Sequence, residues 1–439
     1  MNANVFDSPW QDLLLELLQI DTQSPLETGQ LSHIPDAQQL IARHACQRGF
    51  KSIHLGAPRL SDLHADLVPL NVIEAVITMG SAFIESQPSL VLRAGREQSM
   101  DRTILFNFHI DTVAGTWTPS FVDGRFSGRG AIDAKGPGMA VLAGISRAIT
   151  EEPALLDHIQ ILVQSVSGEE GGAMGVYGTR ALINQGFIGR LNVFAEPSGN
   201  VYFDSATSTM TARIEVAGEG STDDAPATGH NATIILAFIC RQMASDLAWF
   251  FQENRRMCVG GLHTGTAHNR VYGSGVLQLN FAYPDRKTAL EIQALVDLSF
   301  RRALFEFGKQ FSSIPLFARS ATDTAAITSL TWTKKGLPAL ANRDAAMEQL
   351  LAENDIRRCP ADRVNEAFTC DAIWAQRPDS YAIVFGPGDL AANHAHADGE
   401  FVMLADLESY AAKVASLVRS FARVQQRHEQ AALVMEGRL

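Results

Sequence analysis

The sequence predicts an α/β protein, in which a domain with a mostly parallel sheet flanked by helices is interrupted by a smaller α+β domain. Apolar, β-prone runs alternate with helical patterns through the first half of the chain, as in parallel sheets covered on both faces. The pattern changes near Ser205 and resumes near Leu316, which indicates an insertion. The length of 439 residues agrees with this organisation, because it exceeds one ordinary core.

The first elements are two helices followed by strands. Ser8 is expected to cap the first helix, with Pro9 at the first helical position and Gln11 completing a capping box. A second helical pattern covers residues 38–48 and ends at Gly49. The strands expected next cover residues 104–110, 159–166 and 191–194. A helix is expected between the first two of them, at residues 136–149.

The inserted segment has the order strand, helix, strand, helix. Alternation at 210–216 and 276–283 predicts half-buried strands, and residues 234–251 and 288–307 have helical patterns. After the insertion the chain ends in a helix with one apolar stripe. The expected domains are residues 1–206 and 319–439 for the main domain and 207–318 for the insertion.

The composition excludes several kinds of partner. A net charge of −12, without any Lys/Arg block, argues against nucleic acid or a membrane surface. The most apolar stretch, 234–251, is interrupted by Arg241 and Asp246 and falls short of the roughly 20 apolar residues of a membrane span. The five cysteines are scattered without C-x-x-C spacing, which excludes a thiolate zinc site and indicates a reducing compartment. Since no signal peptide is visible, we expect a cytoplasmic protein.

The first candidate site is His109-Ile110-Asp111, at the end of the strand expected at 104–110. The carboxyl ends of strands in an open α/β sheet are the usual place for function. Residues two apart on a strand share a face, so the carboxylate of Asp111 could accept the imidazole N–H of His109 and direct the other nitrogen to a metal. Alone, this pattern is found more often around a structural histidine.

Two further segments place carboxylates in glycine-rich turns. Asp133 lies in Gly-Arg-Gly-Ala-Ile-Asp-Ala-Lys-Gly, where its two oxygens could bridge two cations; the alternative is that it caps the following helix. Glu169 and Glu170 follow the strand expected at 159–166. One could bind a metal while the other takes a proton, and the alternative is a solvated acidic turn.

The last two segments add a carboxylate and a histidine. Glu196 ends the strand-like run at 191–194, and Gly386-Pro387-Gly388 leads to two histidines, His394 and His396. Oxygen ligands with one histidine per metal suit zinc, with manganese or cobalt as alternatives.

In this order, the five segments resemble the M20 family of co-catalytic metallohydrolases over nearly the whole chain. That family includes acetylornithine deacetylase, succinyl-diaminopimelate desuccinylase, acyl-lysine deacetylases and several peptidases. The resemblance implies a catalytic domain interrupted by a lid domain that often mediates dimerisation, and therefore a homodimer.

The resemblance also implies a role for each candidate residue. Asp133 would bridge two divalent ions, and Glu169 would deprotonate a bridging water that attacks an amide carbonyl. Asp111 would orient His109. His396 is preferred to His394, because the family histidine stands four residues before a glutamate of the kind found at Glu400. The implied ligand pairs are His109 with Glu196 on one ion, and Glu170 with His396 on the other.

The lid segment departs from the family pattern. Thr222 stands where the family has a histidine that polarises the scissile carbonyl, and His230, His263 or His268 could compensate. Asn269 matches a lid asparagine near the substrate. The expected substrate contacts are Asn269, Thr222, His230 and Gly388.

Two arginines of the family pattern are also missing. Ala282 and Ile373 occupy their positions, and Arg286 could replace the first of them. Losing two guanidinium groups that grip carboxylates argues against a doubly acidic substrate. We therefore expect a deacylase of N-acyl amino acids, with a dipeptidase or aminopeptidase as the alternative. A binding or regulatory homologue is the alternative from another class.

Overall fold

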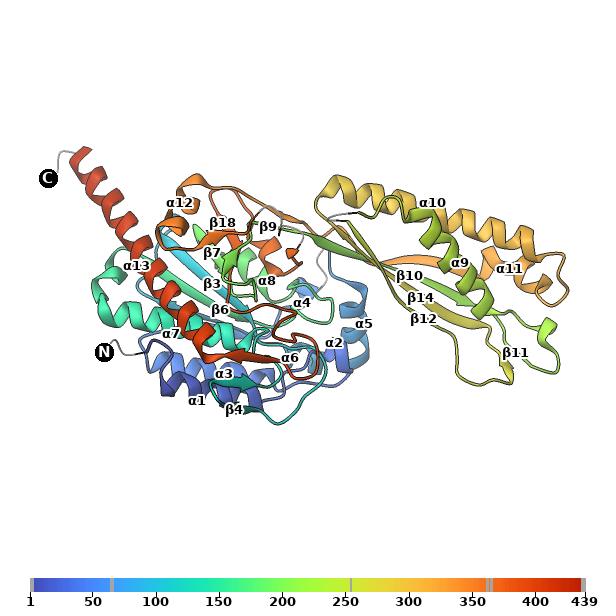
Figure 1. Cartoon of the computed structure of the whole chain (residues 1–439), viewed down its shortest axis with the longest axis horizontal. Coiled ribbons are helices and arrows are strands. Elements are labelled where there is room, and N and C mark those ends of the chain that lie inside the picture. The colour runs from blue at the N-terminus through green and yellow to red at the C-terminus, as the bar shows by residue number, and fades with distance from the viewer. Residues whose placement is uncertain (1–3, 64–66, 253–254, 361–362, 364–365, 436–439) are drawn as a thin grey trace. The chain divides into compact units, whose positions relative to one another are not determined.

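The computed structural model describes residues 4–63, 67–252, 255–360, 363 and 366–435 (Figure 1). The chain divides into two compact units: unit 1 (Met1–Ala206 and Leu340–Leu439) and unit 2 (Thr207–Ala339). The insertion, expected to end at residue 318, therefore extends to Ala339. The reason is β15 (Thr328–Lys334), which pairs with β10 (Ser208–Ala217) and so belongs to the sheet of the insertion.

Unit 1 contains a six-stranded sheet in the order β1-β2-β6-β3-β7-β18. The four strands from β6 to β18 are parallel to one another, and β2 is antiparallel to both of its neighbours. A mostly parallel sheet is thereby confirmed. The strand bounds are β1 (Lys51–Gly56), β2 (Ser89–Ala94), β3 (Thr103–His109), β6 (Gln160–Val166), β7 (Leu191–Phe194) and β18 (Tyr381–Val384).

Helices cover this sheet because its strands are apolar on both faces. Ile104, Phe106 and Phe108 of β3 are buried in the main core of the unit, whereas Leu105 points to the other face and packs in a smaller cluster with Leu182. Figure 1 shows α7 and α13 running side by side in this unit. The helices are α1 (Ser8–Gln19), α2 (Pro25–Thr28), α3 (Ile34–Cys46), α4 (Leu60–Leu63), α5 (Leu70–Met79), α6 (Ser81–Glu85), α7 (Lys135–Glu151), α8 (Thr179–Asn184), α12 (Ala345–Glu353) and α13 (Leu404–Met435).

The start of α1 differs from the prediction by one residue. Ser8 is already helical and Asp7 occupies the N-cap without a side-chain cap hydrogen bond. The Gln11 amide donates to the carbonyl of Phe6 at 2.9 Å rather than closing a capping box. Burial of the apolar face, and not a side-chain cap, stabilises this helix, since Leu13, Leu14, Leu17 and Leu18 are all buried.

Unit 2 contains a four-stranded antiparallel sheet in the order β12-β14-β10-β15. Met210, Ala212, Ile214 and Val216 are fully buried while the residues between them are half-buried, which confirms the alternation expected for this strand. Its core is separate from that of unit 1. The other bounds are α9 (Ala232–Leu247), β12 (Arg256–His263), β14 (Ser274–Tyr283), α10 (Arg286–Phe311) and α11 (Ala318–Ile327). Among the described residues of the chain, no helix is long and apolar enough to span a membrane.

Candidate metal centre

Acidic and histidine side chains collect where the parallel strands of unit 1 end. His109 is the last residue of β3, Glu169 and Glu170 follow β6, and Glu196 lies two residues beyond β7. His396 comes from the loop between β18 and β19 (Phe401–Met403). Parallel strands end at the same edge of a sheet, so segments distant in sequence supply one site.

His109 is held by the main chain of Asp111 rather than by its carboxylate. Nδ1 of His109 lies 2.8 Å from the carbonyl oxygen of Asp111 and 3.9 Å from the nearer carboxylate oxygen. Because a carbonyl only accepts, Nδ1 carries a proton and Nε2 faces the cluster, where a metal would take its lone pair. The Asp111 carboxylate instead accepts the main-chain N–H groups of Glu169 (3.4 Å) and Glu170 (3.0 Å). It therefore orders the acidic pair, which corrects the expected contact.

Asp133 presents its two carboxylate oxygens to two different histidines. Oδ1 lies 2.8 Å from Nε2 of His109, and Oδ2 lies 2.9 Å from Nε2 of His396. Asp133 does not cap α7, because the N-cap is Ala134 and no side chain caps this helix. The two oxygens are thus placed as a bridge between two cations requires.

Two groups of three donors share Asp133. One consists of His109, Asp133 and Glu196, and the other of Asp133, Glu170 and His396, with the donor atoms of each group within 4.8 Å of one another. Oε1 of Glu196 lies 3.7 Å from Nε2 of His109, and Oε1 of Glu170 lies 3.1 Å from Nε2 of His396. The structure therefore brings together the residues of each expected ligand pair around one shared carboxylate.

The loop after β18 separates its two histidines. His396 reaches the acidic cluster, whereas the His394 ring packs against Phe401 with 5.9 Å between ring centroids. Gly388 has a φ of +62°, and a Cβ there would lie 2.7 Å from Oδ1 of Asn393. The Gly388 carbonyl also accepts the Gly199 N–H at 2.6 Å, so the fold itself explains this glycine. Substrate contact at Gly388 stays a prediction.

Glu169 stands beside the two groups that share Asp133. It forms a third group with His109 and Glu170. Burial raises the pKa of Glu169 well above its ordinary value, and the neighbouring Glu170 raises it further. A carboxylate of this kind is suited to accept and return a proton near neutral pH.

The charges of the cluster fit a pair of cations. Burial raises the pKa of Glu196 to about 8, and Asp133 adds to this effect. Burial also acts on Asp133, but hydrogen bonds from His109 and His396 outweigh it and lower the pKa of that carboxyl. Hydrogen bonds to Asp133 and Glu170 raise the pKa of His396 to about 11. Buried carboxylates in this number need positive charge, and one histidine with oxygen donors per group suits divalent metals such as zinc, cobalt or manganese.

Asp371 is a buried carboxyl of this region that was not among the predicted site residues. Burial raises its pKa to about 7, and Asp111 and Glu170 add to the shift. The Thr179 hydroxyl donates to Oδ2 of Asp371 at 2.5 Å, while Oδ1 has no hydrogen-bond partner. The available signal in the sequence is that Asp371 stands two residues before Ile373, an arginine position of the family pattern.

The expected lid contacts belong to unit 2. Thr222 and Arg270 face each other in the short pair β11 (Ser221–Thr222) and β13 (Arg270–Val271), so Asn269 lies next to the position opposite Thr222. His230 is buried, and its ring accepts the Glu219 N–H at Nδ1 (2.9 Å) and lies 3.0 Å from Oδ2 of Asp323 at Nε2. Both nitrogens have partners inside unit 2, and the role of His230 in place of Thr222 stays a prediction.

The two positions without arginine have different surroundings. Ile373 is buried on a short 3-10 helix and offers no polar group. Ala282 lies opposite Arg256 of β12, while Arg286 begins α10. Directly opposite residues share a face of the sheet, so Arg256 is the guanidinium beside Ala282. The replacement of the missing arginine by Arg286 stays a prediction.

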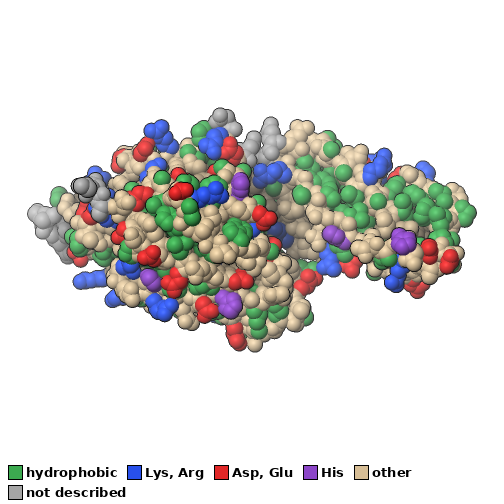
Figure 2. All heavy atoms as spheres, turned by 60° about the horizontal axis from the view of Figure 1, so that its bottom comes forward, with side chains coloured by type: hydrophobic (Ala, Val, Ile, Leu, Met, Phe, Trp, Pro, Cys, Tyr) green, Lys and Arg blue, Asp and Glu red, His purple; other side chains and the backbone are tan. Residues whose placement is uncertain are grey.

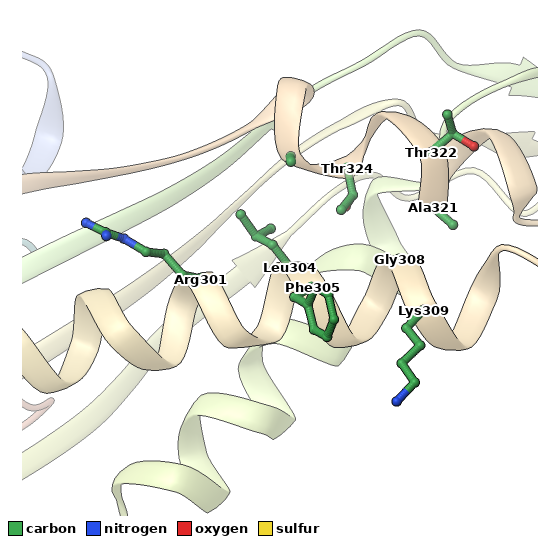
Figure 3. Close-up of a pocket in the computed structure, with 9 residues that line it drawn as sticks. Arg301, Leu304, Phe305, Gly308, Lys309, Ala321, Thr322 and Thr324 are labelled. Atoms are coloured by element: carbon green, nitrogen blue, oxygen red, sulfur yellow. The ribbon is translucent and has the colours of Figure 1, made fainter.

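Unit 2 also contains a groove without titratable clusters. It has a volume of about 560 Å³ and lies between α10 and α11, with Leu304, Phe305 and Ala321 among its lining residues (Figure 3). Figure 2 shows hydrophobic side chains over much of the visible face of this unit. Arg301 and Lys309 border the groove, and its described lining residues include no acid or histidine. Its chemistry suits an apolar contact rather than a reaction.

The sequence matches the model of peptidase family M20/M25/M40 over residues 105–420. A LysW-lysine/LysW-ornithine hydrolase of Sulfurisphaera tokodaii is 25% identical over 198 residues, which cover 45% of this chain and 54% of that protein. A succinyl-diaminopimelate desuccinylase of Acidovorax ebreus is 26% identical over 238 residues, which cover 49% of this chain and 60% of that protein. The chain thus spans about half the length of the curated relatives it matches.

Solved structures show the same fold over nearly the whole chain. A tripeptidase of Staphylococcus aureus matches with a TM-score of 0.65 and 16% identity, and the match covers 94% of this chain and 98% of that one. The family match includes every segment of the acidic cluster, from His109 to His396. The chain belongs to peptidase family M20/M25/M40.

Proposed function

We propose that this protein hydrolyses the amide bond of an N-acyl amino acid at a site that holds two divalent metal ions. The observation that carries the proposal is the placement of Asp133, whose two oxygens each face a separate group of donors. His109 and Glu196 complete one group, and Glu170 and His396 complete the other. Zinc is the metal we propose first, with cobalt or manganese as alternatives.

The residues of the chain then have distinct tasks. When bound, two metal ions would polarise the amide carbonyl and make a water more acidic. Glu169 would take the proton of the attacking water and return it to the leaving amine. Its main-chain N–H is bound by Asp111, which helps to keep this base in one orientation.

The type of amide is the finer part of the proposal. The names of the curated relatives, a hydrolase and a desuccinylase, favour a deacylase. The alternative is a dipeptidase or aminopeptidase, which Ile373 favours, because a buried apolar side chain stands there at an arginine position of the family pattern. A binding or regulatory homologue is the third candidate, motivated by Thr222 in place of a histidine. The expected ligand in the first two cases is a small N-acyl amino acid or a dipeptide.

The test combines metal content with release of free amine. Purified protein and Glu169→Ala are compared on N-acetyl and N-succinyl amino acids and on dipeptides, with Glu97→Ala, at an exposed glutamate, as control. We expect the Glu169 variant to keep its metal and lose roughly 10²- to 10⁴-fold in kcat, since it lacks only the base. Wild-type protein that binds metal but cleaves none of these amides would point to the binding or regulatory homologue.

We also propose a homodimer through unit 2 and a cytoplasmic location. Leu290, Leu298 and Phe305 are exposed and lie eight and seven residues apart on α10, so they share one face of the helix. An apolar face of this kind is typical of an interface between subunits. The five cysteines are scattered without C-x-x-C spacing, which suits a reducing compartment.

A further inference from the structure

The segments that carry Asp133 and His396 meet at one buried carboxylate, Glu400. Its Oε1 accepts the main-chain N–H groups of Ile132 at 3.0 Å and of Asp133 at 3.2 Å. Its Oε2 lies 2.7 Å from Nη1 of Arg129. Glu400 is 1% exposed, and both of its oxygens bind groups of the Asp133 turn.

Arg129 is fixed on every side. Its Nε donates to the Gly115 carbonyl at 3.0 Å and its Nη2 to the Ala114 carbonyl at 3.2 Å, in addition to the bond with Glu400. Its guanidinium lies 5.1 Å from the ring centre of Trp117. The planar fork of an arginine holds a carboxylate in one orientation when its other donors are bound.

The main chain adds a second connection between the same segments. β5 (Arg125–Ser127) pairs antiparallel with β19, so Arg129 follows one strand and Glu400 precedes the other. The Gly128 N–H donates to the Glu400 carbonyl at 3.1 Å. His396 stands four residues before Glu400, and the position of its loop is therefore tied to the turn that carries Asp133.

We infer that the Arg129–Glu400 pair is a positioning device that holds Asp133 as the bridge between the two metal groups. The inference rests on the proposed function, because it takes Asp133 as a shared metal ligand. Glu400 binds the backbone of Asp133, so the two carboxylate oxygens of Asp133 face the two donor groups instead of Glu400 or Arg129.

Stability alone does not account for this pair. Removing a guanidinium and a carboxylate from water costs about as much as their attraction returns, and apolar replacements are often as stable. The pair is instead placed where it sets the direction of a ligand, and contacts of this kind change metal affinity by roughly 10- to 100-fold.

The test measures metal binding in Glu400→Ala, Glu400→Gln and Arg129→Met. The matched control is Asp204→Asn, which disturbs another buried carboxylate held by an arginine, Arg358 at 2.7 Å. Zinc affinity is measured by competition with a chelator, and the magnetic coupling between two bound cobalt ions by electron paramagnetic resonance. A shared carboxylate transmits that coupling, so it reports the bridge itself rather than the stability of the fold.

We expect Glu400→Ala to weaken zinc binding by about 10- to 100-fold and to lose the cobalt coupling. Glu400→Gln retains an oxygen for the two N–H groups and is expected to recover part of both, while Asp204→Asn keeps the wild-type values. The inference is overturned if the Glu400 and Arg129 variants bind zinc and couple cobalt as the control does. Should Glu400→Ala not fold, wild-type affinity and coupling in the other two variants would overturn it equally.

The wild type separates this inference from the proposed function. Wild-type protein without two bound metals would refute the two-metal site before any variant is compared. Wild-type protein with two metals and amide hydrolysis, but with unaffected Glu400 variants, would refute only the positioning role.

Discussion

Single carboxyl groups make the metal-free protein sensitive to pH. Burial raises the pKa of Glu196 from 4.5 to about 8, so the folded state prefers the protonated form. The stability from this preference is complete below the unfolded pKa and is lost as the pH rises through about 8. Stabilisation by a bound metal has the opposite pH dependence and grows as the pH rises, because at low pH the metal must displace protons from its ligands.

We therefore predict that zinc raises the melting temperature more at pH 8 than at pH 5. These two pH values lie near the folded and the ordinary pKa of Glu196, about 8 and 4.5. Thermal unfolding of metal-free and zinc-loaded protein at constant ionic strength measures this difference. Glu196→Gln serves as the control and is expected to flatten the dependence. An equal shift at both pH values in the wild type would contradict the prediction.

A glycine beside the site provides a stability test. Gly175 has a φ of +65°, and a Cβ there would lie 2.2 Å from Oδ1 of Asp371. Gly29 has a similar φ of +69°, but nothing lies within 4 Å of an added Cβ. Both alanine variants pay roughly 1–2 kcal/mol for the left-handed backbone, and only Gly175→Ala adds a clash.

We expect Gly175→Ala to lower the free energy of unfolding by about 1–3 kcal/mol more than Gly29→Ala, because the clash forces Asp371 to move. Urea unfolding of both variants under the same conditions gives the comparison. Similar losses would mean that the loop around Gly175 relaxes without strain.

At the scale of elements, helix capping distinguishes two aspartates. The side chain of Asp285 accepts the Thr288 N–H at 2.7 Å and caps α10, whereas Asp7 occupies the N-cap of α1 without a side-chain cap bond. Asp285→Ala is expected to cost roughly 0.5–2 kcal/mol, and Asp7→Ala much less. Hydrogen exchange at the first turn of each helix measures the effect. Equal protection in both variants would show that packing, and not the cap, starts α10.

The elements also show where sequence patterns are reliable. β7 was predicted with the bounds it has, Leu191–Phe194, because a short apolar run between turns has one way to be buried. β12 and β15 were not predicted as strands. Their exposed and half-buried residues lack a clear alternation, and their conformation depends on pairing with β14 and β10.

At the scale of the molecule, the two units have separate cores. The two points of unit 1 between which the insertion lies are neighbours. Ala206 of β9 (Ser205–Ala206) pairs with Leu340 of β16 (Leu340–Ala341), so the chain leaves and re-enters unit 1 at neighbouring positions. Removal of residues 207–339, with a short linker in their place, should leave a folded unit 1 that binds two metals. Circular dichroism and metal analysis check this outcome.

The same deletion tests the proposed dimer. Full-length protein is expected to sediment as a dimer and unit 1 alone as a monomer, because the exposed face of α10 is removed. As a control, Leu298→Lys in the full chain should give a monomer that keeps its metal. A dimer that survives both changes would place the interface elsewhere.

The sequence by itself determined the family and those elements whose apolar residues are periodic. Periodic burial requires periodic apolar residues, and metal chemistry requires histidines and carboxylates at the ends of strands. Both patterns can therefore be recognised in short stretches of the sequence. The tertiary structure decided what depends on distant segments. The carbonyl of Asp111 binds the His109 ring, and Glu400 binds the backbone of the Asp133 turn. The two ring nitrogens of His230 contact Glu219 and Asp323, and β15 pairs with the sheet of the insertion. A hydrogen bond is set by where two parts of the chain meet, and one local pattern cannot specify its partner.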